Sequence, residues 1–252
     1  DYPGNNIKYW KVPGGKWKWI LYDTDFGFAG RWWSDWDQNF AHTYNTLEFA
    51  LEPNGPGWPN PPWSTLFLRK LMENNEFRNK FVNRFADEMN TRFLPANVTN
   101  HFLDIYDNIY DELIYHIDRW IDSEPWANIN TVYQFVDNMN NFAINRQPEV
   151  KQHILDQFDL DSYHEVVLFN ETPQLGYIYI NNNLTIQEDE WSGDYFEDVP
   201  ITLKAIAESG SEFSHWSGDV NSTESEIFLP KASVSLRALA KSISTDSDLA
   251  MF

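Results

Sequence analysis

The chain has 252 residues, with 38 acidic against 18 basic side chains and a formal net charge of −20 at pH 7. This charge argues against nucleic acid or an anionic membrane as a partner, because neutralising phosphates requires clustered Lys and Arg. The absence of cysteine excludes disulfides, thiolate metal sites and a cysteine nucleophile. No apolar run reaches the length of a transmembrane helix.

A β-hairpin is predicted near the N-terminus. The strands are expected at Ile7–Val12 and Trp17–Tyr22, and Pro13-Gly14-Gly15 between them is a turn signal. Aromatic residues alternate with lysines along both strands, which is the period of two typical of a strand with one wet face. Because the chain leaves and returns, the residues before the first strand and after the second are expected at the same end.

The polar residues at that end have a kinase-like order. Asp1 and Asn6 repeat the D-x-x-x-x-N spacing of a kinase catalytic loop, and Asp23-Thr24-Asp25-Phe26-Gly27 contains the Asp-Phe-Gly triplet that binds metal in kinases. Phosphoryl transfer needs a carboxylate to accept a hydroxyl proton and hard oxygen ligands to hold Mg²⁺ against the phosphates. The alternative interpretation is turn capping, since Asp and Asn favour turns.

Residues 28–62 form a long stretch rich in Trp, Asn, Gly and Pro that is predicted to be irregular. Loops of this length are functional or are packed by their own side chains. Trp32, Trp33 and Trp36 therefore either line an acceptor or glycan site or attach the loop to the body of the protein.

Four helices are predicted between Trp63 and Asp156, because apolar residues recur there every three or four positions. Their apolar stripes are expected to form core; they are Leu66, Leu68, Leu71 and Met72, then Phe77, Phe81, Phe85 and Met89, then Val98, Phe102, Ile105, Ile109, Leu113, Ile117 and Trp120 after Pro95, and finally a helix over Val132–Ile154. Asp104, Asp107, Asp111, Glu112 and Asp118 indicate a solvated face of the third helix. His101, His116 and His153 lack metal-ligand spacing.

A small β-sandwich or meander is predicted in the C-terminal part. Five short β-like runs are separated by Asn, Gly, Ser and Pro, at Glu165–Phe169, Gly176–Ile180, Ile201–Ile206, Ser225–Leu229 and Ser233–Leu239. The expected domains are residues 1–160, residues 161–240 and a tail over 241–252. The fold class is therefore α+β, with a hairpin and helices followed by a small all-β domain.

Three N-terminal stretches together resemble the spore-coat protein H (CotH) kinase family: Asp1–Trp10, Lys16–Gly27 and Tyr44–Leu47. Phe77–Phe81 and Arg84–Asp87 resemble the helical part that follows in that family, so the resemblance covers residues 1–157. It implies a secreted, atypical protein kinase of bacteria that depends on Mg²⁺ and ATP.

The same resemblance implies roles for individual residues. Asp1 would be the catalytic residue that faces the phosphoacceptor hydroxyl, Asn6 and Asp25 would bind the cofactor, and Asn6, Asp23 and Asp25 would be metal ligands. The Gly-rich loop, strand lysine and partner Glu that precede the catalytic Asp of kinases have no counterpart here. We therefore expect a kinase-like C-terminal lobe that is inactive without an N-terminal lobe.

The β-rich part resembles a second family, the divergent B-repeat module of internalin-type bacterial surface proteins. Pro200–Ala205 and Phe213–Asp219 carry this resemblance, which covers residues 164–240 and implies an accessory module without chemistry of its own. Both resemblances imply a secreted or cell-surface protein whose partner is a protein substrate, a surface partner or a glycan. The alternative function is a non-catalytic adhesion or binding protein built on a kinase-like scaffold.

Overall fold

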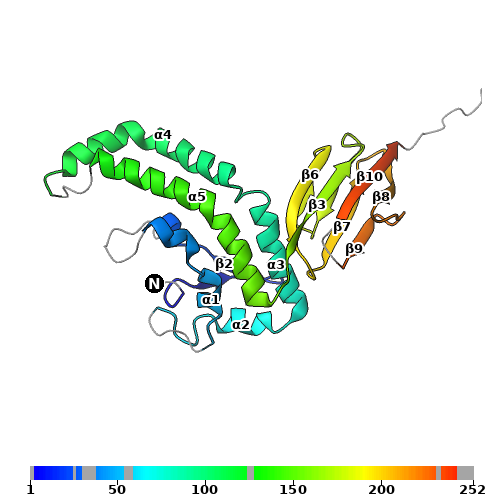
Figure 1. Cartoon of the computed structure of the whole chain (residues 1–252), viewed down its shortest axis with the longest axis horizontal. Helices are drawn as coiled ribbons and strands as arrows, with labels where there is room; N and C mark the ends of the chain where they lie inside the picture. Colours follow the sequence, from blue (N-terminus) through cyan, green and yellow to red (C-terminus); the bar gives the residue numbers. More distant parts are fainter. Residues whose placement is uncertain are drawn as a thin grey trace, which may run out of the picture. The chain divides into compact units, whose positions relative to one another are not determined.

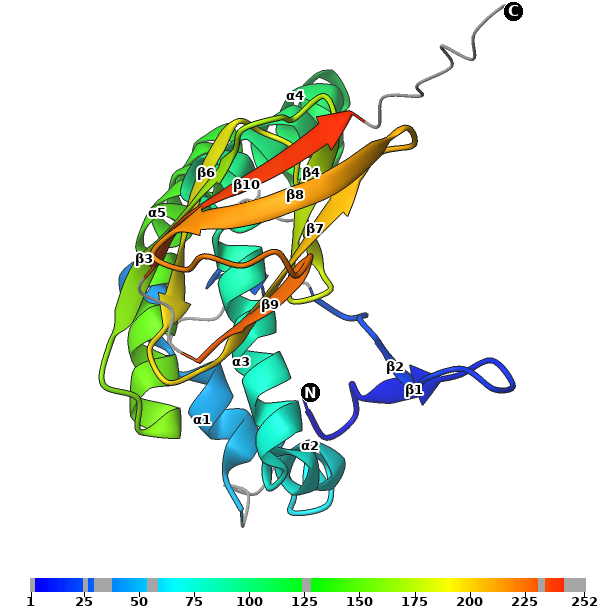
Figure 2. The ribbon, with the colours of Figure 1, turned by 90° about the vertical axis from the view of Figure 1, so that its right-hand side faces the viewer.

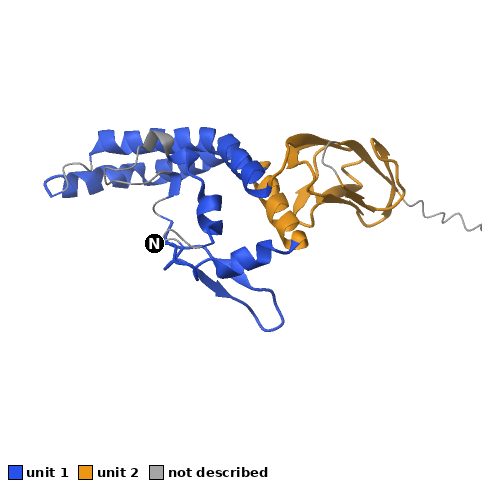
Figure 3. Ribbon diagram, turned by 60° about the horizontal axis from the view of Figure 1, so that its bottom comes forward, with its two compact units in different colours: residues 1–74, 91–158 blue, residues 75–90, 159–252 orange. Residues whose placement is uncertain are grey.

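The computed structural model describes residues 3–24, 27–29, 38–53, 59–123, 128–230 and 234–242 (Figure 1). The chain divides into two compact units (Figure 3). The helical unit comprises Asp1–Asn74 and Thr91–Phe158, and the β unit comprises Asn75–Asn90 and Asp159–Phe252. The segment Asn75–Asn90 thus belongs to the same unit as the C-terminal strands, although residues 91–158 of the other unit separate them in the sequence. No helix in the described ranges is long and apolar enough to span a membrane.

The helical unit contains the predicted hairpin and three of the four predicted helices. Its elements are β1 (Lys8–Trp10), β2 (Lys18–Ile20), the 3-10 helices η1 (Gly27–Ala29) and η2 (Gln38–Thr43), α1 (Thr46–Leu51), α2 (Leu66–Met72), α4 (Pro95–Trp120) and α5 (Ile129–Phe158). β1 and β2 pair antiparallel with Tyr9 opposite Trp19. Pro95 occupies the first turn of α4, as predicted, because its missing N–H costs nothing there.

The region 28–62 is less irregular than predicted. The short helix α1 begins after Asn45, whose side chain accepts a hydrogen bond from the Glu48 N–H at 3.0 Å. An N-cap of this kind replaces a hydrogen bond that the first helical turn lacks. Trp32, Trp33 and Trp36 lie outside the described residues.

α4 and α5 lie side by side and antiparallel (Figure 1). Thr99 Oγ1 donates to Asn140 Oδ1 at 3.0 Å, and the hydroxyls of Tyr110 and Tyr133 are 3.2 Å apart. The prediction that the whole apolar stripe of α4 is core was wrong. Phe102 is buried, but Ile105 and Ile109 remain 50% and 49% exposed, because α5 covers only part of the helix circumference. The five acidic residues of α4 are all exposed, as expected of a solvated face.

The β unit is a sandwich of two four-stranded sheets, with the strand orders β6-β3-β10-β8 and β5-β4-β7-β9 (Figure 2). Its strands are β3 (Tyr163–Asn170), β4 (Gly176–Ile180), β5 (Leu184–Ile186), β6 (Glu190–Phe196), β7 (Ile201–Ala207), β8 (Ser211–Gly218), β9 (Glu226–Leu229) and β10 (Val234–Ser242). β10 pairs parallel with β3, and every other described pair in the two sheets is antiparallel. Fully buried side chains from both sheets form the core, among them Leu168, Ile178, Leu203, Trp216 and Leu236.

Sequence periodicity identified five of these strands and missed β5, β6 and β8. The predicted tail also begins too early, because Lys241 and Ser242 lie in β10 and pair with Glu212 and Ser211 of β8. Residues 243–252 lie outside the described residues.

The remaining helix, α3 (Asn75–Met89), belongs to the β unit. Its buried side chains are Val82, Asn83, Ala86, Asp87 and Met89. The predicted core stripe was therefore only partly right. Phe77, Phe81 and Phe85 are half-buried and contact one another, with ring centroids 6.4 and 5.1 Å apart, while the neighbouring face is the one that is covered.

Candidate functional site

The segment that carries the candidate site is fixed by a backbone contact at Gly4. The Gly4 N–H donates to the Pro59 carbonyl at 2.8 Å. A Cβ at this position would lie 2.4 Å from the same oxygen, so only glycine allows the close approach. Asn60, which is 1% exposed, in turn donates to the Phe49 carbonyl at 2.6 Å and accepts from Ser64 Oγ at 2.5 Å. The loop before β1 is thus tied to α1 and to the Pro-rich loop.

The two ends of the hairpin meet as predicted. Asn6, just before β1, donates a short hydrogen bond from Nδ2 to Asp23 Oδ2, beyond β2. Beside it, the Tyr22 hydroxyl donates to the Asn5 carbonyl at 2.7 Å, and Lys8 Nζ lies 4.7 Å from the centroid of the Tyr22 ring. The structure therefore brings together two of the four predicted site residues. Asp1 and Asp25 lie outside the described residues.

The Asn6–Asp23 pair has the chemistry of a site for a hard cation. Because the amide nitrogen of Asn6 donates to one carboxylate oxygen, its amide oxygen and Asp23 Oδ1 are left for other ligands. Mg²⁺ prefers such oxygens and keeps several of its waters, which an exposed position permits. Asp23 has a φ of +56°, a conformation that Asp adopts more readily than most residues. No group of three or more His, Cys, Asp or Glu within the described ranges is placed to hold a metal, so the pair needs water or further residues to complete a coordination shell.

A half-buried arginine of α5, which the sequence analysis did not single out, holds the segment around the start of α1. Arg146 donates to the carbonyls of His42 and Tyr44 at 2.5 and 2.8 Å and to Thr46 Oγ1 at 3.2 Å. Burial lowers the pKa of this guanidinium. Residues of the Tyr44–Leu47 motif therefore have a structural role here, since they cap α1 and accept hydrogen bonds from Arg146. In the sequence, Arg146 is a single arginine within a predicted helix, and this pattern is too common to indicate a structural role.

His153 lies two turns further along the same helix, and its predicted structural role agrees with its surroundings. Burial and the positive charge of Arg146 lower the pKa of His153, which favours the neutral ring. Both effects disfavour the charged imidazolium.

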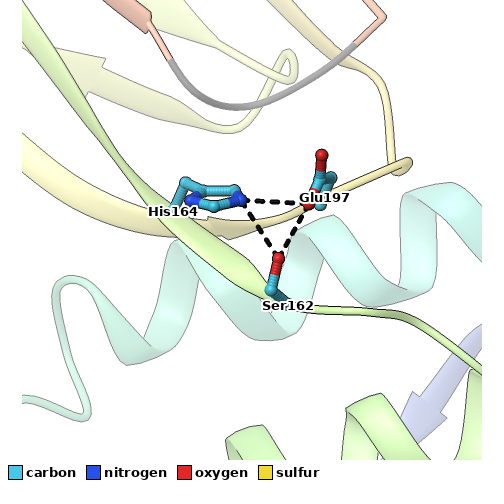
Figure 4. Close-up of polar contacts among 3 residues, drawn as sticks. All are labelled: Ser162, His164 and Glu197. Carbon is cyan, nitrogen blue, oxygen red and sulfur yellow. Dashed lines mark hydrogen bonds and ion pairs between the residues drawn. The ribbon is translucent and has the colours of Figure 1, made fainter.

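A second polar cluster, in the β unit, contains the residue types of a hydrolase triad but not its geometry (Figure 4). Ser162 Oγ, His164 Nε2 and Glu197 Oε2 form a triangle with sides of 2.8 to 3.0 Å. In a catalytic triad the serine and the carboxylate contact different ring nitrogens, so that the proton can pass through the imidazole. Here both contact Nε2 and the serine donates directly to Glu197. The cluster ties the start of β3 to the turn after β6.

The fold and the site together define an α+β protein with a kinase-like helical part, bearing a polar hairpin end, followed by a β domain. The family model for the CotH kinase protein matches residues 1–150, and the chain belongs to this family. Comparison with curated proteins and with solved structures gave no match. The family match ends within α5, so the resemblance of the β unit to a B-repeat module stays a prediction.

Proposed function

We propose that the protein supplies the kinase-like lobe of an atypical protein kinase, which transfers the γ-phosphoryl group of Mg²⁺-ATP to a Ser or Thr hydroxyl of a protein once an N-terminal lobe completes the nucleotide site. Membership of the CotH kinase family supports the reaction class. The observation that carries the assignment to this site is the hydrogen bond between Asn6 and Asp23, which joins the two segments of kinase-like sequence across the hairpin.

The residues have distinct tasks in this proposal. Asn6 and Asp23, with Asp25, would hold Mg²⁺ through oxygen ligands and supply negative charge to it. The Asp1 carboxylate orients the acceptor hydroxyl and takes its proton as the oxygen attacks the γ-phosphorus in line, and ADP leaves. When bound, Mg²⁺ neutralises the charge that develops on the phosphate oxygens. The Gly4 and Asn60 contacts keep the loop before β1 in one conformation.

We propose a secreted or cell-surface location and a protein partner, on the basis of the family resemblance. A second function is supported by a separate observation on the hairpin. Tyr9, Trp10 and Trp17 are 46%, 46% and 59% exposed, and lysines lie over two of the hairpin's tryptophan rings. Exposed rings of this kind stack on sugars, so the alternative is a surface protein that binds a glycan or another surface partner through the hairpin.

Calorimetric titration of Mg²⁺-ATP distinguishes the two proposals. In a form that includes an N-terminal lobe, the wild-type protein is expected to bind, and Asp23→Ala and Asp25→Ala are expected to lose binding. Asp111→Ala, which removes an exposed carboxylate of α4, is the matched control and should bind like wild type. If binding follows this pattern, loss of phosphorylation in Asp1→Ala tests the role of that carboxylate. Absence of binding by the folded wild-type protein with an N-terminal lobe present would overturn the kinase proposal and direct the search to glycans.

A further inference from the structure

Each sheet of the sandwich has an edge strand close to α3. β6 contacts the helix directly, and β5 directly follows a turn that contacts it. β6 is at the edge of one sheet, and β5 is at the edge of the other. An edge strand exposes backbone N–H and C=O groups that need a partner. Asn90, directly after α3, provides one, because its Nδ2 donates to the Asp194 carbonyl at 2.8 Å and its Oδ1 accepts from the Asp194 N–H at 3.0 Å. The asparagine amide therefore pairs with β6 in the way that another strand would.

The contact at Asn90 requires a glycine in the strand. A Cβ at Gly193 would lie 2.8 Å from the Asn90 side chain and 2.5 Å from the Trp191 ring. These distances are shorter than nonbonded atoms tolerate, so β6 has room for the helix end only because residue 193 has no side chain.

Asp87 makes the central contact between α3 and the strands. It is 2% exposed, and its carboxylate accepts three hydrogen bonds. The Tyr195 hydroxyl of β6 donates to Oδ1 at 2.7 Å, and Asn181 and Asn183, from the turn between β4 and β5, donate to Oδ1 and Oδ2 at 3.1 and 2.8 Å. One side chain of the helix thus binds elements of both sheets.

The donors around Asp87 are themselves held in place. Asn181 adopts a left-handed conformation with a φ of 52°, and its backbone N–H and side-chain oxygen bond the carbonyl and the N–H of Thr202 at 2.8 and 3.1 Å. A buried carboxylate is costly unless hydrogen-bonded. The network satisfies it only when α3 has one register against the strands.

Further contacts extend this interface along the helix. Asn83 donates to the Pro200 carbonyl, just before β7, at 2.8 Å, and Val82 and Ala86 on the same face are 1% and 0% exposed. The strands and turns of the sandwich therefore cover α3 over about two helical turns.

We infer that α3 is an integral element of the sandwich, that the β6 edge and the β4–β5 turn form a docking surface for it, and that Asp87 sets its register. Residues 91–158 are then an insertion between two segments that fold as one unit. This inference does not rest on the kinase proposal. Its consequence is that α3, which lies within the family-matched segment, and the β strands unfold together, so the β unit is not a detachable accessory module.

Hydrogen exchange of the full chain, measured by mass spectrometry at increasing denaturant, tests the inference. In the wild type, α3 amides and amides of the core strand β7 are expected to share one opening transition. Asp87→Ala leaves three donors without an acceptor, so exchange in α3 should accelerate about 10- to 100-fold. Tyr195→Phe removes one hydroxyl and keeps the ring, so it should give a smaller acceleration, about tenfold or less. Glu76→Gln breaks only the exposed ion pair with Lys80 within α3, so it is the control and should keep exchange within about twofold of the wild type.

Each outcome decides the inference. It is supported if α3 opens together with β7 and if the two network variants accelerate exchange in α3 while the control does not. Should Asp87→Ala fail to fold, the Tyr195→Phe comparison decides. The inference is wrong if α3 opens separately from β7, or if neither foldable network variant changes exchange in α3.

Discussion

The hairpin of the helical unit and the strands of the β unit have the same alternating pattern in the sequence but different surroundings. All residues of β1 and β2 are exposed, whereas β4 buries every second side chain. The contrast is clear for tryptophan, since Trp19 in β2 is 52% exposed and Trp216 in β8 is fully buried. Periodicity of two thus identifies which residues share a face of a strand, and says nothing about whether another layer covers that face.

The hairpin is stabilised mainly by contacts among its own side chains. The Tyr9 and Trp17 rings meet edge to face with centroids 5.5 Å apart, Lys11 lies 5.0 Å from the Trp17 ring, and Tyr9 also contacts Phe67 of α2. Each such contact contributes about 0.5–1.5 kcal/mol, and an isolated two-stranded hairpin is marginally stable. Its sequence is therefore expected to tolerate substitutions that the sandwich does not.

A tryptophan truncation in each region gives the largest expected difference. Trp216→Ala should lower the free energy of unfolding of the β unit by about 3–5 kcal/mol, because it leaves a cavity in the core and removes the hydrogen bond from Nε1 to the Glu224 carbonyl. Trp19→Ala should cost about 1 kcal/mol or less. Chemical denaturation followed by circular dichroism measures both. Equal losses would show that the hairpin is covered as tightly as the sandwich.

Removal of the half-buried Arg146 extends the comparison to the helical unit. Arg146→Ala should lower the stability of this unit by about 2–3 kcal/mol, because two carbonyls and one hydroxyl lose a charged donor. Arg119→Ala, at an exposed position near the end of α4, is the control. Thermal denaturation is the measurement, and a loss no greater than that of the control would contradict the structural role of Arg146.

The pH dependence of stability provides a third comparison, at Asp87. Burial raises the pKa of this carboxyl, although hydrogen bonds from Tyr195, Asn183 and Asn181 oppose the shift. The folded protein therefore keeps the proton at a pH where the unfolded chain has released it. The stabilisation is full below the unfolded pKa and is lost as the pH rises through the folded pKa. Asp87→Asn should remove this dependence.

Denaturation of the wild type and of Asp87→Asn between pH 3 and 7 checks this sign. The stability of the wild type relative to the variant should decrease as the pH rises, and the difference cancels the titration of the other carboxylates. A difference that increases with pH would mean that the hydrogen bonds outweigh burial at Asp87.

The smallest effect on stability is expected at the candidate site. Asn6→Ala and Asp23→Ala each break one exposed hydrogen bond and should change the free energy of unfolding by about 0.5 kcal/mol or less. The same variants should nevertheless lose Mg²⁺-ATP binding if the site is functional. A large loss of stability with unchanged binding would assign the pair a purely structural role.

Much of the fold could be predicted from local signals. The Gly-Gly turn and the flanking polar residues predicted both the hairpin and the approach of Asn6 to Asp23, because a two-stranded hairpin returns the chain to its starting point. Pro95 and the apolar spacing of α4 predicted its start and its length. The strands β6 and β8 were missed because both contain Gly and Ser, and β6 also contains Asp; these residues have weak β-propensity and form strands here through their neighbours.

What the sequence could not predict depends on contacts between distant segments. The apolar spacing of α4 was read as core, yet α5 covers only part of it, and the number of layers around a helix is not encoded in its period. Asp87 in Arg84-Phe-Ala-Asp87 has the pattern of an ordinary exposed carboxylate. Its burial follows from donors about a hundred residues later, at Asn181, Asn183 and Tyr195.

That separation has a consequence during synthesis on the ribosome. The donors to Asp87 follow it by 94 to 108 residues, and β10, which completes its sheet by pairing with β3, follows later still. Because a ribosome adds about 5–20 residues per second, roughly 5–20 s pass between the synthesis of α3 and the synthesis of the residues that bind it. Throughout that interval the Val82 and Ala86 face is open to chaperones or to other nascent chains, and an ionised Asp87 at its centre opposes premature burial of that face.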